Sequence, residues 1–467
     1  MSEMKSQINK IKLINFYGCI WLVLLVLFFL FCYLNESGIE ERKIILIVFF
    51  LGFLGLIATW RLSLYEFVPP INNIGFILIS VSILYSIYPG LSFWLSDFQF
   101  SLISDNRLLS KKVKAWEIVE FYDFYLYYIV GLTIGYFIFQ KPLSKVSKFK
   151  DQVFIPPIYL HISISLYIFI ELFFLVTTLT SLSNIYFVQQ LLHNLNQLQF
   201  FYLISIFFIG LTNKDKRFWN VVISIFFLYE FGSMILLTTG RTYFYLLIIS
   251  FLICYTLCRK NISYKSAILF FLILFIFFLF WGMLRVKQLQ YLGSYPIFSA
   301  SNEFTSIFAT GFDLFDRKKL GILPEPIPFS IIYNDLVLLI PSQFLSIEKW
   351  SLAQWYKQII GSYSSGFGFG VIAQGVIGAG TIELLLRGLI TGSIFALFHN
   401  YYKRNSNRFW LNVIYVYIAV RSYHIMRSGF GYIVYDIFYV AIPAVLIALL
   451  YVKLISIFSK KSSIKPI

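Results

Sequence analysis

Three basic side chains recur at a regular spacing in the segment RSYHIMR. Arg421, His424 and Arg427 follow one another every three residues, so a helix would place them on one face. The planar fork of arginine suits phosphate oxygens, and each charge-assisted hydrogen bond contributes about 1.5–3 kcal/mol. An imidazole in the same place could accept a proton as a general base. The spacing predicts an anion site, and the simpler alternative is that each arginine extends to lipid headgroups.

Two further arginines stand at the ends of apolar blocks. Arg241 lies in TTGRTYF, a short turn between two blocks, and Arg285 ends another block in MLRVKQ. Glu303, in SNEFTSIF, is a candidate base, and Asp313 is available for the same role. The site that we expect therefore has His424 and Glu303 as catalytic residues and Arg241, Arg285, Arg421 and Arg427 as anion ligands.

Acidic residues inside the apolar blocks have a less specific interpretation. Glu171 and Glu230 lie in the middle of blocks, and Asp436 lies near the end of the last one. We expect each of them to neutralise an arginine rather than to catalyse. No H-E-x-x-H, D-x-D or Walker pattern occurs, and the four cysteines lack the spacing of metal ligands, so we expect neither a metal nor a cofactor.

The elements that must position these residues are membrane spans. Hydrophobic residues make up 59% of the 467 residues and charged residues 13%, whereas soluble domains carry roughly 25% charged residues. The apolar residues come in blocks of about twenty, the length that crosses a hydrocarbon core. We expect an all-α polytopic membrane protein with about twelve transmembrane helices. The blocks lie at 14–34, 44–60, 74–94, 118–139, 158–179, 198–211, 219–237, 243–257 and 267–284, with one span within 361–402 and two more at 409–426 and 432–454.

The distribution of charge between the blocks predicts the orientation. Runs of Lys and Arg at the amino terminus, at 141–150, 214–217, 259–265, 403–408 and 460–465 fall on one side if 361–402 crosses once. The positive-inside rule makes that side, with both termini, cytoplasmic. The basic residues at 107–114 fall outside and are an exception. The net charge of +16 is thereby explained without a nucleic-acid partner.

Two segments between the blocks are unusual. Residues 361–402 are rich in glycine, which lets helices pack closely or break, and we expect a broken or re-entrant helix over about 366–381. Residues 285–365 form a large external loop with several prolines, in which 331–345 suits an interfacial amphipathic helix. The expected organisation is a membrane domain at 1–284 with about nine spans, the external loop at 285–365, and a membrane domain at 366–467.

Several short motifs together resemble one family. These are GRTYFYLLII, RVKQ, NEF, the segment SSGFGFGVIAQGVIGAGTIELLLRGLITGS and a closing span with paired arginines. The chain is similar in these features, in span count and in loop size to the Wzy-type polymerases of bacterial O-antigen and capsule repeat units. Gln374 departs from the pattern, because an acidic residue is expected in that segment.

The resemblance implies a metal-independent glycosyltransferase in the bacterial cytoplasmic membrane, with its active site on the outer face. Its donor and acceptor would be lipid-linked oligosaccharides on undecaprenyl diphosphate, and a chain-length regulator is a further candidate partner. The four arginines would then bind the diphosphate. His424 or Glu303 would take the proton from the acceptor hydroxyl.

Three alternatives remain open at this point, of which a non-enzymatic membrane scaffold would leave the arginines near the ends of the spans without a role. A ligase that transfers finished polymer is similar in span count and loop, but such enzymes rely on a loop histidine, and residues 285–365 contain none. A flippase or transporter of lipid-linked oligosaccharides would show paired repeats and charges through the middle of the membrane, whereas the two halves of this chain look unlike each other.

Overall fold

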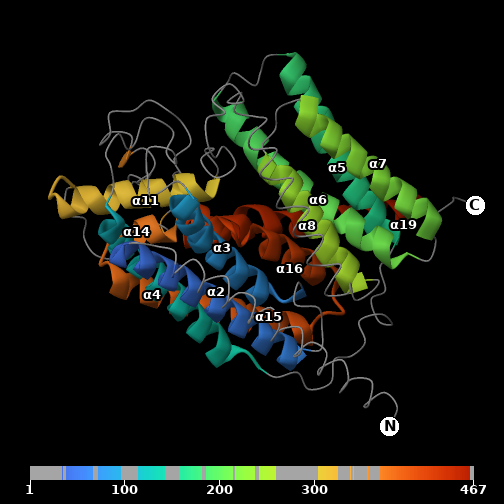
Figure 1. Ribbon diagram of the computed structural model, residues 1–467. Helices are drawn as coiled ribbons and strands as arrows, with labels where there is room; N and C mark the ends of the chain where they lie inside the picture. Colours follow the sequence, from blue (N-terminus) through green and yellow to red (C-terminus); the bar gives the residue numbers. More distant parts are fainter. Residues whose placement is uncertain are drawn as a thin grey trace, which may run out of the picture. The chain divides into compact units, whose positions relative to one another are not determined.

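The computed structural model describes nine stretches of the chain, which are drawn as ribbons in Figure 1. These are residues 38–66, 72–95, 114–141, 157–180, 186–213, 216–236, 241–258, 303–323 and 369–462, with the isolated residues 34, 337, 340, 355 and 356. Regular structure within them is helical, without strands. The longer helices are α2 (Ile39–Glu66), α3 (Ile74–Leu95), α4 (Ala115–Phe139), α5 (Pro157–Leu179), α6 (Tyr186–Thr212), α7 (Lys216–Leu236), α8 (Arg241–Cys258), α11 (Glu303–Lys319), α15 (Thr381–Arg404), α16 (Phe409–Arg421) and α19 (Ile442–Ser462).

Five helical stretches in the described part are long and apolar enough to cross a membrane. They are Ala115–Phe139, Ile158–Thr177, Asn194–Thr212, Thr381–Arg404 and Phe430–Ile455. Shorter apolar helices lie at Ile74–Gly90, Phe218–Tyr229, Leu246–Cys258 and Phe409–Arg421. The chain is therefore helical in the manner of a membrane protein, while the count of twelve spans stays a prediction. Residues 14–33 of the first block, the block at 267–284 and almost all of the predicted amphipathic segment 331–345 lie outside the described residues.

The sixth apolar block forms a long helix although part of it is polar. Its strongly apolar part, 198–211, was too short to cross, and it needed the polar stretch 193–199 for full length. Helix α6 (Tyr186–Thr212) includes that stretch. Gln199 is buried, and its amide donates to the carboxylate of Glu171 on α5. A polar residue is therefore accommodated inside the span by a partner on the neighbouring helix.

The chain divides into two compact units, each of which is discontinuous in sequence. Unit 1 comprises Met1–Leu143, Ser263–Asn400 and Tyr423–Tyr432, and unit 2 comprises Ser144–Ile262, Tyr401–Ser422 and Ile433–Ile467. In unit 2, helices α5, α7 and α8 contact α6, and α16 packs on α6 and α8.

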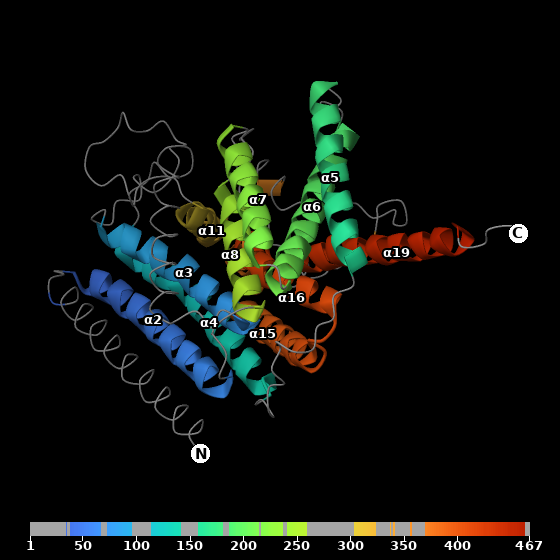
Figure 2. The same cartoon turned by 90° about the vertical axis from the view of Figure 1, so that its right-hand side faces the viewer.

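In unit 1, helices α2, α3 and α4 lie side by side (Figure 2). Helix α3 runs antiparallel to α4, because polar contacts join opposite ends of the two helices. Asn73 caps the start of α3 by accepting from Gly75 N at 2.8 Å, and the same oxygen accepts from Tyr136 OH, near the end of α4, at 2.6 Å. Near the start of α4, Tyr122 OH donates to the Ser86 carbonyl on α3 at 2.8 Å.

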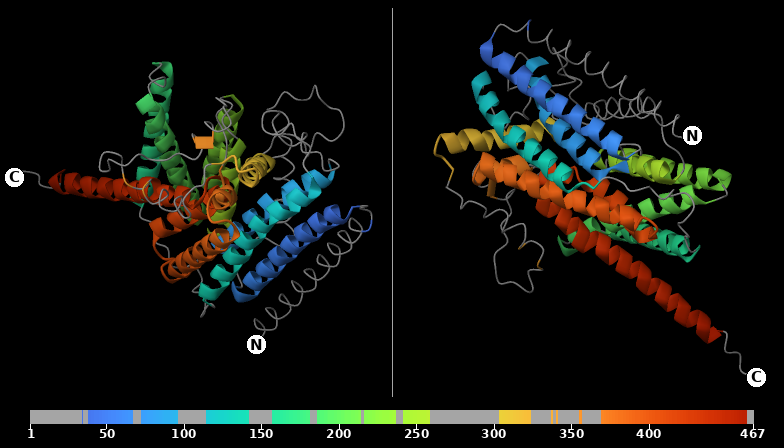
Figure 3. Two further views of the ribbon diagram at one scale, coloured as in Figure 1. Left: turned by 90° about the vertical axis from the view of Figure 1, so that its left-hand side faces the viewer. Right: turned by 90° about the horizontal axis from the view of Figure 1, so that it is seen from below.

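Helix α15 crosses α4 at very short range (Figure 3), where glycines replace side chains on both helices. A Cβ atom on Gly131 would lie 2.3 Å from the Leu385 carbonyl oxygen, and one on Gly388 would lie 2.3 Å from the Tyr128 oxygen. Gly135 and Gly392 repeat the arrangement one turn later, so each helix contributes a G-x-x-x-G pair. The later glycine of α4 contacts the later part of α15, so α4 and α15 run parallel.

The carboxyl ends of these two parallel helices meet at one end of unit 1. The Asn400 amide donates to the Phe139 carbonyl at 2.7 Å, and its oxygen accepts from Lys141 N at 3.2 Å. At the opposite end of this contact the start of α15 lies beside Phe124, in the first half of α4.

Candidate functional site

The glycine-rich segment contains a helix break. Helix α14 (Val371–Ile377) has only seven residues, and α15 begins at Thr381. Gly380 has φ 77°, in the left-handed region that glycine adopts without strain. At the other end of α14, a Cβ on Gly370 would lie 1.7 Å from the Met426 carbonyl oxygen. Glycine is thus required both for the turn and for close contact with the segment that carries His424.

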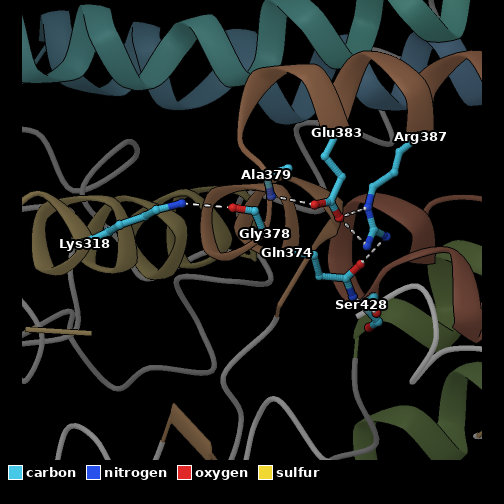
Figure 4. Close-up of polar contacts among 7 residues, drawn as sticks. All are labelled: Lys318, Gln374, Gly378, Ala379, Glu383, Arg387 and Ser428. Atoms are coloured by element: carbon cyan, nitrogen blue, oxygen red, sulfur yellow. Dashed lines mark hydrogen bonds and ion pairs between the residues drawn. The ribbon is translucent and has the colours of Figure 1, made fainter. Parts of the chain in front are cut away.

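Charged side chains from two neighbouring elements satisfy the backbone of this break (Figure 4). Lys318, on α11, donates from Nζ to the carbonyls of Val376 at 2.7 Å and Gly378 at 3.0 Å. Ala379 N donates to the Glu383 carboxylate at 2.7 Å. A broken helix inside a membrane protein requires such partners, because each unsatisfied backbone group costs several kcal/mol in an apolar setting.

Glu383 also belongs to a buried polar network that joins three elements of unit 1. Arg387, one turn further along α15, donates from Nε to the Glu383 carboxylate at 2.8 Å and from a terminal nitrogen to the Gln374 side-chain oxygen at 3.1 Å. The Gln374 amide donates in turn to the Ser428 carbonyl at 3.3 Å. The side chains of Arg387 and Glu383 are 6% and 0% exposed. The network therefore fixes α14 and α15 to the last residue of α17 (His424–Ser428).

Helix α17 (His424–Ser428) carries two of the predicted site residues. The imidazole of His424 is buried, with its ring centroid 4.1 Å from that of Tyr423 and 4.4 Å from that of Tyr432. Arg427 is half-buried on the same short helix. His424 and Arg427 therefore both lie next to the broken segment, since Ser428 and Met426 contact it.

The continuous helix predicted through RSYHIMR is interrupted. Helix α16 ends at Arg421, residues Ser422 and Tyr423 form a turn, and α17 begins at His424. Arg421 belongs to unit 2, whereas His424 and Arg427 belong to unit 1. The sequence interpretation of one helical face therefore needs correction, because the helix that carries Arg421 does not continue to the other two residues.

Within unit 2, Arg421 is engaged by a carboxylate. It donates from Nε to one oxygen of Asp436 at 2.9 Å and from a terminal nitrogen to the other at 3.1 Å. Tyr417 OH donates to the same carboxylate at 3.4 Å, and both charged side chains are buried. Asp436 begins a π-helical turn, Asp436–Ala441, ahead of α19. The expected neutralisation of an arginine by Asp436 is thus present, and a bidentate carboxylate occupies the fork proposed for phosphate.

The remaining predicted residues lie where their side chains are not described. Arg241 is the first residue of α8 in unit 2, Glu303 is the first residue of α11 in unit 1, and Arg285 is outside the described residues. The convergence of four arginines on one anion therefore stays a prediction. The buried carboxylate of Asp313 accepts from Arg317 at 2.9 Å and from Tyr356 at 2.5 Å, and its role as a base stays a prediction.

Three residues that contribute to this site were not identified as such from the sequence. Lys318 lies within 285–365, the segment predicted to be an external loop, and only its contact with α14 shows its role. Glu383 and Arg387 follow the glycines of this segment, and the sequence assigns no role to either. Their spacing of four residues inside an apolar helix was the available signal, since such a pair neutralises itself. Gln374, which departs from the expected acid, both accepts and donates here, and a carboxylate could not donate to Ser428.

Metal binding has no support from the described side chains, among which no group of three or more His, Cys, Asp or Glu is placed to hold an ion. The chain matches no known protein family, and no similar curated protein or solved structure was found.

Proposed function

We propose that this chain is a membrane-embedded polymerase that joins oligosaccharide repeat units carried on a polyprenyl diphosphate, as in O-antigen or capsule synthesis. The observation that carries the proposal is the position of α17 beside the broken helix. His424 and Arg427 lie beside a broken, glycine-rich helix whose backbone and buried charges are satisfied by Lys318, Glu383 and Arg387. Broken helices at membrane depth occur where they line a cavity, and basic groups there suit an anionic lipid substrate.

The proposed reaction is a glycosyl transfer. A hydroxyl of the acceptor sugar attacks the anomeric carbon of the donor, the bond from that carbon to the diphosphate oxygen breaks, and polyprenyl diphosphate leaves. Arg427, with Arg241 and Arg285 as further candidates, would stabilise the negative charge on the leaving group. The hydroxyl proton would pass to His424 or Glu303. Arg421 is the weakest member of the predicted set, because Asp436 already neutralises it.

The parallel arrangement of α4 and α15 supports an active site on the outer face. Their carboxyl ends meet at Asn400 and Lys141, next to the basic runs 141–150 and 403–408 that the positive-inside rule assigns to the cytoplasm. The amino ends of both helices, with the break and α11, would then face the exterior, where lipid-linked repeat units are polymerised in this class of enzyme.

The test is reconstitution of the full chain in lipid nanodiscs with a defined diphospholipid-linked repeat unit. We expect a ladder of polymer that is unaffected by chelators. His424→Ala and Arg427→Ala should each abolish the ladder, while Lys43→Gln, at an exposed ion pair with Glu40, should retain it. A chain that moves the lipid across vesicle membranes without making polymer would instead be a flippase. Transfer of preformed polymer to a second acceptor, without a ladder, would indicate a ligase.

A further inference from the structure

The end of α11 forms a turn that exposes two large apolar side chains. Gly321, with φ 68°, donates to the Lys318 carbonyl at 3.1 Å, and Ile322 N donates to the Arg317 carbonyl at 3.0 Å. This pair of bonds is the Schellman arrangement that ends many helices, and it commonly brings a hydrophobic contact with it. Here Leu320 and Ile322, on either side of the glycine, are each 58% exposed. The backbone of the turn is well satisfied, whereas its apolar side chains are left uncovered.

The residue just before this turn connects it to the amino end of α4. Lys319 Nζ lies 4.3 Å from the centroid of the Trp116 ring and forms an ion pair with Glu120. Trp116 is itself 38% exposed. Tryptophan and lysine are the two side chains that gather where a span meets the headgroups, since each has an apolar body and a polar end.

The exposed stripe of α4 locates this contact at the boundary between water and lipid. At the start of the helix the exposed positions are Trp116, Glu120 and Asp123. From Tyr127 onward the exposed residues of the same stripe are uncharged, with Ile134 at 45% and Ile138 at 66% exposure. A helix face that changes from acidic to apolar in this way leaves the headgroups near the point of change.

Helix α15 independently indicates where the lipid-facing surface begins. Its exposed apolar stripe begins at Ile382, in its first turn, with 67% exposure. A Cβ on Gly380, just before that turn, would lie 4.0 Å from the Phe124 ring of α4. The lipid-facing stripes of the two parallel helices therefore begin side by side, near Tyr127 of α4, about two turns beyond the residues that Lys319 contacts.

We propose that the turn Leu320–Ile322 inserts into the interfacial layer of the bilayer leaflet in which α4 and α15 begin. The two apolar side chains would enter the boundary between headgroups and acyl chains, and Lys319 would lie among lipid phosphates. The bilayer is a better occupant than a protein partner, because Lys319 pairs with Trp116 and Glu120 on a face of α4 that becomes apolar within the next two turns. The anchor holds α11, and therefore Lys318 and the helix break, at a fixed depth. It does not depend on the proposed enzymatic activity.

The direct test is depth-dependent quenching of a fluorophore on the turn. Leu320→Cys and Ile322→Cys are made in the full chain with Cys19, Cys32, Cys254 and Cys258 changed to alanine. They are labelled with an environment-sensitive dye in vesicles of phosphatidylethanolamine and phosphatidylglycerol. We expect blue-shifted emission at both positions and the strongest quenching by lipids brominated near the headgroup end. Ile134→Cys should be quenched best by deeply brominated lipids, and Lys114→Cys, exposed at the N-cap of α4, should be quenched least of all positions.

Two results would overturn the anchor. Dye at positions 320 and 322 that behaves like dye at Lys114 would place the turn in water. Blue-shifted emission without quenching by any brominated lipid would mean that protein covers it. Hydroxyl-radical footprinting of the unsubstituted chain in nanodiscs gives a second measurement that does not depend on the cysteine variants. Leu320 and Ile322 should oxidise as slowly as the lipid-facing Leu386 of α15, and rapid oxidation would contradict the proposal.

Discussion

Arg387 and Glu383 form an ion pair within one turn of α15, with a terminal guanidinium nitrogen 2.7 Å from the carboxylate. Both side chains are buried, so neither charge has water to replace its partner. The pair does not stand alone, because the carboxylate accepts from Ala379 N in the helix break and the guanidinium reaches Gln374. Loss of one partner therefore leaves a buried charge and disturbs the break as well.

Arg387→Gln and Glu383→Gln should each destabilise the protein by about 3–5 kcal/mol, the usual consequence of breaking a buried pair. The double substitution should be less harmful than the sum of the two, because it leaves no uncompensated charge. Thermal unfolding in detergent measures both effects. Lys43→Gln is the matched control, since it removes an exposed pair with Glu40, and should change stability by less than about 1 kcal/mol. Equal effects at the buried and exposed pairs would contradict this account.

The crossing of α4 and α15 gives a prediction about backbone contact. Gly388→Ala would put a Cβ 2.3 Å from the Tyr128 oxygen and 2.7 Å from Leu132 N, and neither backbone atom can move without displacing a helix. We expect a loss of about 1–3 kcal/mol or more from overpacking, measured by thermal unfolding. The control is Gly232→Ala on α7, where the Cβ meets nothing within 4 Å. That variant should gain up to about 1 kcal/mol from helix propensity. If Gly388→Ala is as harmless as Gly232→Ala, the close crossing is wrong.

Much of the helical architecture follows from the sequence, for identifiable reasons. Apolar blocks as long as 118–139 predict helices such as α4 (Ala115–Phe139), because in lipid the backbone must satisfy its own hydrogen bonds. The interruption between α14 and α15 was also predictable, from the density of glycine. The sequence contains the two G-x-x-x-G pairs at which α4 and α15 cross. A single sequence does not show which helices such pairs bring into contact.

The candidate site was less predictable, because its side chains come together only through tertiary contact. The spacing of Arg421, His424 and Arg427 correctly indicated helical structure, but it could not reveal the turn at Ser422 that separates Arg421 from the other two. Nor could it show that Asp436, fifteen residues further along, accepts both hydrogen bonds from Arg421. Lys318 lies 58 residues before its partner Val376, and no local pattern connects them.

Tyr356 gives a prediction about pH. Burial and then the nearby Asp313 carboxylate raise the pKa of Tyr356 well above its ordinary value of 10.0, so its hydroxyl stays protonated and donates to Asp313. The unfolded chain has the lower pKa, so the stabilisation is complete below about pH 10 and declines above it as the unfolded tyrosine ionises.

Tyr356→Phe should therefore cost about 1–3 kcal/mol at neutral pH, because the buried Asp313 carboxylate loses a donor. The difference in unfolding free energy between the two proteins should narrow above about pH 10. Paired urea or thermal unfolding curves across pH 7–11 measure it, and taking the difference cancels the titration of the other tyrosines. If the difference in unfolding free energy grows with rising pH, the pKa of Tyr356 is not raised by folding.

The ion pair of Arg421 and Asp436 decides whether Arg421 binds substrate or only holds the fold. Asp436→Asn leaves a buried guanidinium with a neutral partner, and Arg421→Gln leaves a buried carboxylate, so each should destabilise by about 3–5 kcal/mol. Exchanging the two residues, Arg421→Asp with Asp436→Arg, keeps both charges and should recover part of that loss. Thermal unfolding gives the stability, and the polymer ladder gives the activity. If Arg421 only stabilises the fold by pairing with Asp436, the exchanged protein should recover polymerase activity together with stability. A stable exchanged protein that makes no polymer would show instead that Arg421 itself contacts the diphosphate, despite the carboxylate that occupies its fork.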